Sequence, residues 1–199
     1  MELAKASLDR LPAYTDALKT GWSPDNLRLE VAREQLDAAS RDPQRFVATF
    51  EDLEAKGDAI VLPDGSRVPR LPGLQRWIWD DGFCGIIGLR WQPGTEELPA
   101  HCPGHVGYSV VPWRRREGLA SAALVELLPE ARATGLRYIE VTTSPSNIAS
   151  IKVIERAGGT FVERFQRHPA LGGEEALRFR ICLGCGGVER GADKRFHSA

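Results

Sequence analysis

The alternation of strand-like and helix-like segments in the second half of the sequence constrains the fold most. Short runs of apolar and β-branched residues are typical of strands, and apolar residues recurring every three to four positions are typical of helices. Both kinds of segment follow one another without long interruptions. A β-α-β-α-β order of this kind requires a mixed sheet with helices packed on it. Strands are predicted at 105–111, 138–142, 160–166 and 176–183, and helices at about 117–133 and 147–157.

The first half of the sequence predicts helices, a long loop and a hairpin. Between Pro24 and Phe50 apolar residues recur at helical spacing, and Asp42-Pro43 marks a break between two helices. Ser23-Pro24-Asp25 favours a helix start, because a short oxygen-bearing side chain caps a helix and proline fits its first turn. Proline and glycine breaks predict a loop over 62–73. Strands at 74–79 and 83–91 follow, joined by an Asp-Asp-Gly turn, and a second loop spans 92–104.

Composition narrows the class of protein. The chain has 199 residues, a length that suits one domain with a single sizeable core. With 26 basic and 27 acidic residues, its formal charge of −1 argues against nucleic acid or an anionic membrane as partner. No apolar run approaches a membrane span, and charges interrupt the N-terminus where a signal peptide needs an apolar core. Four cysteines are too few for a disulfide scaffold, so we expect a cytoplasmic protein.

The segment from Gly104 to Ser121 carries the strongest chemical signal. A strand leads into a short turn with Arg115, Gly118 and Ala120, and an amphipathic helix follows. A turn of small residues at a helix start exposes backbone N–H groups, which together with the helix dipole favour a phosphate. A solvated basic turn before a surface helix explains the spacing about equally well. The segment has neither the lysine of a nucleotide-binding loop nor the three glycines of a dinucleotide fingerprint.

Two motifs in this frame resemble those of one family. Val110-Val111-Pro112 followed by Arg115 to Ala120 is similar to the acyl-CoA-binding motif of GNAT-superfamily N-acetyltransferases. Asn147 to Gly159 resembles the second motif of that family, in which an asparagine opens a helix that ends at a glycine pair. The order of the motifs and the strand between them also fit. The N-terminal helices resemble those of a bacterial group of predicted acetyltransferases.

The resemblance implies a fold and a reaction. The fold is of the α/β (α+β) class, a GNAT-like mixed and mostly antiparallel central sheet flanked by helices, with an N-terminal helical extension. The expected segments are 1–60 (helical, packed on the core), 61–183 (acetyltransferase core) and 184–199 (polar tail). The expected reaction moves an acetyl group from the co-substrate acetyl-CoA to a primary amine of a small molecule or a peptide, by direct attack.

The resemblance also assigns the co-substrate site. The strand ending at Val110 and Val111 is expected to pair with the pantetheine arm, and an N–H there to polarise the thioester carbonyl. The pyrophosphate is expected at the following turn, mostly on backbone N–H groups. The expected site residues of this part are Val110, Val111, Arg115, Arg116, Glu117, Gly118, Leu119, Ala120, Ser121 and Asn147.

The catalytic residues depart from the common pattern of the family. Many members carry a tyrosine seven residues after the asparagine, and here that position is Ile154. Ser150 is the nearest substitute as proton donor, although a serine there also commonly bonds a helix carbonyl. His105 is the best candidate base, unless it only satisfies a buried polar contact. Tyr108 is a third candidate, although strand alternation puts it on the face opposite His105 unless a bulge intervenes.

Two other classes of function stay open. One is a non-catalytic acyl-CoA-binding sensor or interaction module of the same fold, which the missing tyrosine favours. The other is a zinc-stabilised protein that uses His101, Cys102 and His105 with Cys182 and Cys185. Cysteines at a strand end are more often small apolar residues, so no metal is expected. Homodimers are common among such folds, but the sequence specifies no interface.

Overall fold

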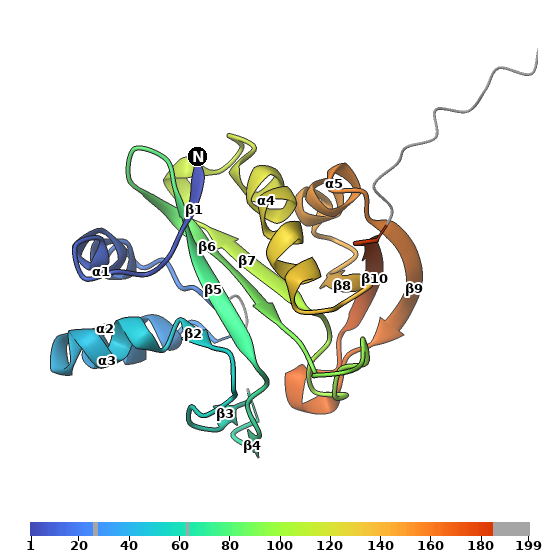
Figure 1. Cartoon of the computed structure of the whole chain (residues 1–199), viewed down its shortest axis with the longest axis horizontal. Helices are drawn as coiled ribbons and strands as arrows, with labels where there is room; N and C mark the ends of the chain where they lie inside the picture. The colour runs from blue at the N-terminus through green and yellow to red at the C-terminus, as the bar shows by residue number, and fades with distance from the viewer. Residues whose placement is uncertain (26–27, 63, 185–199) are drawn as a thin grey trace, which may run out of the picture.

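The protein is built around one mixed sheet with helices on both faces (Figure 1). This computed structural model describes residues 1–25, 28–62 and 64–184. The sheet has the strand order β1-β5-β6-β7-β8-β10-β9, and β2 also pairs with β5. Helices α1 to α3 cover one face, and α4 and α5 cover the other. The expected fold class is therefore confirmed.

The elements have the following bounds. The strands are β1 Glu2–Ala4, β2 Glu51–Asp52, β3 Ile60–Val61, β4 Arg67–Val68, β5 Gly73–Trp79, β6 Phe83–Arg90, β7 Val106–Val110, β8 Tyr138–Thr143, β9 Thr160–Gln166 and β10 Glu175–Cys182. The helices are α1 Leu11–Lys19, α2 Val31–Arg41, α3 Pro43–Ala48, α4 Leu119–Ala133 and α5 Ile148–Arg156. Two 3-10 turns are η1 Pro112–Arg114 and η2 Pro169–Leu171.

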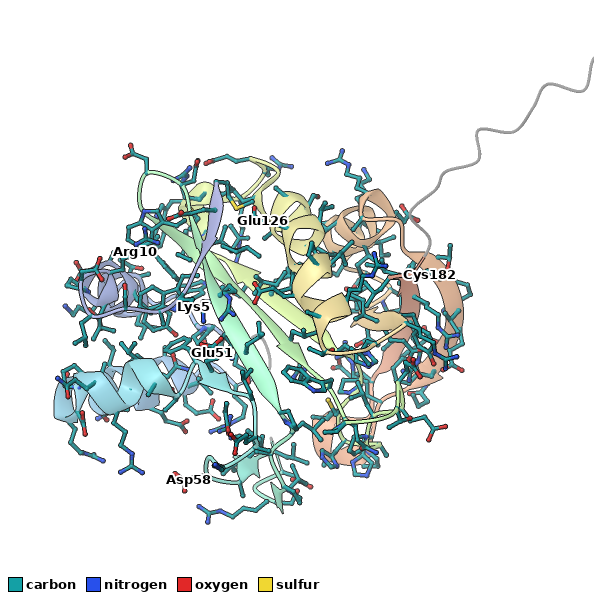
Figure 2. The ribbon with its side chains drawn as sticks, viewed as in Figure 1. Lys5, Arg10, Glu51, Asp58, Glu126 and Cys182 are labelled. Carbon is teal, nitrogen blue, oxygen red and sulfur yellow. The ribbon has the colours of Figure 1, made fainter. Side chains whose placement is uncertain are left out.

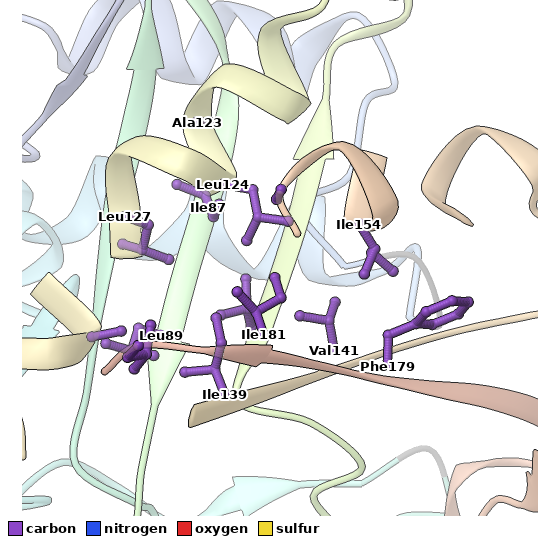
Figure 3. Close-up of a cluster of buried hydrophobic side chains, with 14 of the residues drawn as sticks. Ile87, Leu89, Ala123, Leu124, Leu127, Ile139, Val141, Ile154, Phe179 and Ile181 are labelled. Carbon is purple, nitrogen blue, oxygen red and sulfur yellow. The ribbon is translucent and has the colours of Figure 1, made fainter. Parts of the chain in front are cut away.

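Two apolar cores hold the layers together. The first lies between the sheet and helices α4 and α5, where aliphatic side chains from both layers meet (Figure 3). Leu124, Leu127 and Ile154 are fully buried in it. The second core lies under α1 to α3 and is aromatic, with the Tyr14 ring stacked on Trp77 at 5.0 Å between centroids. Strands β5 and β6 contribute buried side chains to both cores, which explains the nearly continuous apolar sequence of β6.

The sequence had predicted a helical N-terminal segment, but this segment also contains strands. Residues 2–4 and 51–52 form strands β1 and β2, which pair antiparallel with β5. Strands of two or three residues are too short to show a periodic pattern, and their pairing with β5 defines them. The predicted helix start at Pro24 is also wrong, since α2 begins at Val31. The break at Asp42 is confirmed: its side chain accepts a hydrogen bond from the Arg45 N–H and caps α3.

The predicted loop over 62–73 contains regular structure. Ile60 pairs with Val68 and Val61 with Arg67, so β3 and β4 form a small hairpin. Gly65 allows this turn because it adopts a φ of +84°, a region that other residues rarely enter. The hairpin crosses the predicted segment boundary at residue 60. The predicted polar tail lies outside the described residues from residue 185 onward.

An ion cluster around Arg76 joins three elements. The buried Arg76 guanidinium donates to the two carboxylate oxygens of Glu130 on α4 at 3.1 and 2.6 Å. It also donates to Glu51 of β2 at 3.0 Å. Lys5 donates to the same Glu51 carboxylate, and the two residues lie side by side next to β5 (Figure 2). The cluster therefore ties the N-terminal segment and α4 to the central sheet.

Replacing Arg76 with methionine is expected to lower the free energy of unfolding by about 2 kcal/mol, because two half-buried carboxylates lose their partner. Burial raises the pKa of Glu51, but hydrogen bonds from Lys5 and Arg76 lower it overall. A lowered folded pKa means that this stabilisation is present above the unfolded pKa and is lost as the pH falls through the folded value. Urea unfolding of Arg76→Met and wild type at about pH 7 and about pH 3 measures both effects. An equal loss in Arg132→Met, an exposed arginine on α4, would contradict this account.

Candidate active site

The central sheet opens between its two parallel strands. β7 and β8 pair at a single position, Val106 with Val141, whereas β6 and β7 pair at five positions. The Val111 N–H donates to the Cys84 carbonyl of β6. Since successive residues of a strand direct their backbone groups to opposite sides, those of Tyr108 and Val110 point toward β8. Beyond Val106 they meet no partner strand, so an extended ligand has a free backbone edge to pair with.

This geometry separates two residues that the sequence had grouped together. Val110 presents its backbone to the opening, and its carbonyl accepts a hydrogen bond from Arg115 Nε at 3.1 Å. Val111 is fully buried under the N-terminal helices, and its N–H is already bonded to β6. The predicted ligand contact of Val111 is therefore not available. The N–H nearest the opening is that of Val110.

The turn before α4 presents a helix start without a side-chain cap. Gly118 occupies the N-cap position with a φ of +81°, and no side chain caps the helix there. By helix geometry the N–H groups of Leu119, Ala120 and Ser121 have no acceptor within the helix. Arg116 also has a positive φ of 71°, so the turn curls in front of the helix start. These features fit a pyrophosphate group, which needs several N–H donors and positive potential.

The three consecutive arginines, at positions 114 to 116, differ in what they contribute to the turn. Arg114 donates to the Asp80 carbonyl and carboxylate at 2.9 Å each, and to Glu117 at 2.8 Å. It thereby fastens the turn to the β5–β6 hairpin. Glu117 was predicted to contact the co-substrate, but its carboxylate repels phosphate and is occupied by Arg114. Arg115 and Arg116 supply the charge near the helix start.

Two of the three predicted catalytic residues meet at this opening. Tyr108 packs with Val106 and Val110 on the face that α4 and α5 cover, as strand alternation predicts. Burial raises the pKa of Tyr108, and an interaction with the Ser150 side chain opposes that rise. Ser150 lies in the first turn of α5, where its N–H donates to the side chain of Asn147 at 3.1 Å. Asn147 therefore caps α5 and holds Ser150 beside the phenol.

His105 lies apart from the opening. Its side chain is fully buried, and Nδ1 accepts the Glu140 N–H of β8 at 2.9 Å. Nε2 has no hydrogen-bond partner among the described residues. Burial is the main cause that lowers the pKa of His105 to about 4; the Glu140 charge opposes this shift and the Arg90 charge adds to it. This environment favours a neutral imidazole that joins β7 to β8, and it disfavours the predicted role as a base.

Because His105 is buried and neutral, we expect the free energy of unfolding to decrease in acid. The pKa of His105 is about 4 in the folded state, against about 6.5 in an unfolded chain. Between the unfolded and the folded pKa of His105, the unfolded chain binds a proton that the folded chain does not bind. The free energy of unfolding therefore decreases as the pH falls through this range, and it stops decreasing below the folded pKa. The loss is expected to reach about 3 kcal/mol between these limits. Comparing the unfolding free energies of wild type and His105→Asn across this range measures it, with the exposed His168→Asn as control. A constant difference between wild type and His105→Asn would contradict the prediction.

An open hollow of about 450 Å³ lies on the opposite face of the sheet. Its walls are α2, the β3–β4 hairpin and the loop at 101–103, and its floor is formed by β5, β6 and β7. Tyr108 is among the residues that line this hollow, although its side chain packs on the other face of the sheet, where it interacts with Ser150. The volume lies in the range of small-molecule sites, roughly 300–1,000 Å³. The hollow is therefore the candidate acceptor site.

The polar floor of this hollow was not predicted from the sequence. Gly88 and Gly107 lie opposite each other on β6 and β7, and the Arg90 guanidinium lies beside Gly107. A signal was present, since both strands are interrupted by a glycine at a position where neighbouring residues are bulky. Only the register between the strands shows that these glycines face one another.

Within residues 1–25, 28–62 and 64–184, no group of three histidine, cysteine or acidic side chains is placed to hold a metal ion. Cys185, one member of the alternative zinc site, lies outside that part. No helix in the same part is long and apolar enough to cross a membrane.

Comparison with protein families gives one match that covers most of the chain. The model described as "Acetyltransferase (GNAT) domain" matches residues 15–160. This range includes the opening between β7 and β8, the turn before α4, and α5. No curated protein matches the sequence significantly.

Solved structures with the same fold share little sequence with the chain. The microcin C7 self-immunity acetyltransferase MccE, in complex with acetyl-CoA and AMP, has 12% identity and a TM-score of 0.57, covering 90% of this chain and 91% of that one. The ribosomal L7/L12 α-N-protein acetyltransferase RimL, in complex with coenzyme A, has 15% identity and a TM-score of 0.57, covering 90% and 92%. The spermidine N-acetyltransferase SpeG from Vibrio cholerae, an F149A mutant, has 11% identity and a TM-score of 0.54, covering 92% and 95%. At these identities the likeness concerns the fold.

Proposed function

The chain belongs to the GNAT acetyltransferase family, whose co-substrate is acetyl-CoA. On this basis we propose which residues bind each substrate and which ones take part in the transfer. The opening between β7 and β8 and the turn before α4 receive acetyl-CoA. The hollow on the other face receives a primary amine, carried by a small molecule or a peptide. The observation that carries the proposal is that Tyr108 lines the hollow and also contacts Ser150.

Acetyl-CoA supplies the acetyl group as a thioester, and the chain supplies two binding elements. The backbone of Tyr108 and Val110 pairs with the pantetheine arm, since these groups face the opening. The pyrophosphate lies on the N–H groups of Leu119, Ala120 and Ser121, which Gly118 leaves accessible because it has no Cβ. Arg115 and Arg116 add positive charge. Arg115 must then release the Val110 carbonyl that it binds in this structure.

Tyr108 is the proposed proton donor to the departing thiolate. Its raised pKa keeps the phenol protonated at neutral pH, as a general acid requires. Ser150 interacts with the phenol, and Asn147 orients Ser150, so these two are positioning residues. The Val110 N–H is the proposed donor to the oxyanion that forms on the thioester carbonyl. This arrangement replaces the tyrosine of the common pattern, whose place is taken by the buried Ile154.

The similar structures illustrate the range of acceptors that the family takes. RimL is named as an acetyltransferase of a protein α-amine, and SpeG as one of spermidine. A peptide or a small amine is therefore an equally reasonable acceptor class for this fold. We also propose a cytoplasmic location, on the composition and on the free cysteines among the described residues, of which Cys84 and Cys102 are buried. Homodimerisation stays a prediction that a single chain does not test.

The test combines binding with turnover. Thermal unfolding with acetyl-CoA at about 100 times its dissociation constant is expected to show a stabilisation of about 2.7 kcal/mol, visible as several degrees. Release of free thiol in the presence of a panel of amines then measures transfer. Binding without transfer to any amine would favour the alternative, a non-catalytic acyl-CoA sensor, to which the loss of the usual tyrosine at Ile154 also points.

A further inference from the structure

The floor of the hollow is built around one arginine. Gly88 of β6 and Gly107 of β7 are register partners, so neither strand carries a side chain there. A Cβ at Gly107 would lie 3.0 Å from Nη2 of Arg90. The guanidinium therefore lies over the bare backbone of β7, within the hollow that Arg90 and Gly107 both line. Any side chain at position 107 would displace it.

The other two arginines that line the hollow are paired with carboxylates. Arg28 donates to Glu30 at 3.0 Å and to Glu34 at 2.7 Å. Arg70 faces Asp52 at 3.7 Å, and the Asp52 carboxylate also accepts the N–H groups of residues 56 and 57. Asp25 accepts the Arg28 N–H. These groups belong to the walls, and the charges of Arg28 and Arg70 are paired within the walls.

Arg90 differs from them. It is exposed, and it makes no ion pair within the described part of the chain. Its charge lowers the pKa of two buried groups, Cys102 and His105. Burial has the larger effect on both, raising the pKa of Cys102 and lowering that of His105. The floor of the hollow therefore carries one positive charge without a counterion, beside the residue that connects to Ser150.

We propose that Arg90 binds an anionic oxygen group, a carboxylate or a phosphate, on the acceptor amine, and so selects anionic amines. This inference rests on the proposed function, because it assigns the acceptor class of that same site. A guanidinium presents a planar fork of donors that matches either anion in a bidentate manner. The same charge repels a second ammonium group, so polyamines are expected to be poor acceptors.

The experiment uses four small amines that differ mainly in charge. Phosphoethanolamine and β-alanine carry a phosphate and a carboxylate, ethanolamine is uncharged beyond its amine, and putrescine carries a second amine. Their acetylation rates and their binding to the coenzyme A-loaded protein are both measured, the latter by calorimetric titration. Both anionic amines, or one of them, are expected to exceed ethanolamine by about tenfold or more in kcat/KM and in affinity. The better of the two identifies the anion.

Variants of Arg90 decide whether this residue is the cause. Arg90→Gln is expected to remove the preference for anionic amines, and Arg90→Lys to keep part of it, because lysine retains the charge but not the fork. Arg132→Gln, an exposed arginine on the opposite face, is the matched control and should change nothing. Thermal stabilisation by acetyl-CoA verifies that each variant is folded and binds the co-substrate.

The two proposals fail in distinguishable ways. Equal use or binding of all four amines, or a preference that survives in Arg90→Gln, overturns the role of Arg90. If no amine is acetylated, the titrations still decide: anion binding lost in Arg90→Gln supports the role of Arg90 while the proposed transferase activity fails. If neither anionic amine binds, the inference is overturned whatever the activity.

Discussion

Replacing Tyr108 with phenylalanine is expected to reduce kcat by about 100-fold or more, because a positioned general acid contributes roughly that much. The ring stays in place, so packing against the first core and binding of acetyl-CoA are expected to be unchanged. Since burial raises the pKa of the phenol, the wild-type rate should not fall on the alkaline side until the pH exceeds the ordinary tyrosine value. Steady-state kinetics across the pH range, with the best amine from the panel, measure both effects.

Two companion variants show whether the loss comes from the phenol itself. Ser150→Ala removes the side-chain interaction with Tyr108 but leaves the phenol, so a smaller loss of about tenfold is expected. Tyr138→Phe is the matched control, a tyrosine on neighbouring β8 whose ring lies under Arg180 rather than at the opening. Full activity of Tyr108→Phe would exclude the phenol as proton donor and leave Ser150 as the candidate.

The frame around the opening could be predicted from sequence because each of its elements buries an apolar face. Helix α5 was predicted from residue 147, and the structure has Asn147 as its cap and Ile148 as its first helical residue. The N-terminal strands could not be predicted in this way. β1 spans three residues and is defined by its pairing with β5, a contact more than 70 residues away in the chain that no local pattern encodes.

The placement of a site residue could be predicted only where it depends on a single strand or helix. The alternation of β7 correctly put Tyr108 on the face opposite Gly107 and Ser109. The burial of His105 was not predictable, because it depends on Glu140 of β8, a strand that meets β7 at one position. The polar floor depends likewise on the register that brings Gly88 opposite Gly107. Residues whose role arises from two strands meeting were thus missed or misassigned.

Replacing Gly118 with valine is expected to abolish the stabilisation by acetyl-CoA, at concentrations where wild type gains about 2.7 kcal/mol. Gly118 has a φ of +81°, a conformation that a β-branched residue adopts only with strain of about 1–3 kcal/mol. No protein atom lies within 4 Å of a Cβ built at this position. The Cβ of the new side chain therefore meets open space, and we expect the branched side chain to obstruct the approach of a phosphate to the α4 N–H groups. Thermal unfolding with increasing acetyl-CoA measures the loss.

Gly135 separates the strain from the loss of binding. It follows α4 at its other end, has a φ of +90°, and likewise has no protein atom within 4 Å of an added Cβ. Gly135→Val should therefore destabilise the free protein about as much as Gly118→Val, yet keep the full response to acetyl-CoA. If both variants lose the response, strain alone explains it. If both keep it, the pyrophosphate does not lie at the start of α4, and the opening between β7 and β8 must hold the co-substrate without this turn.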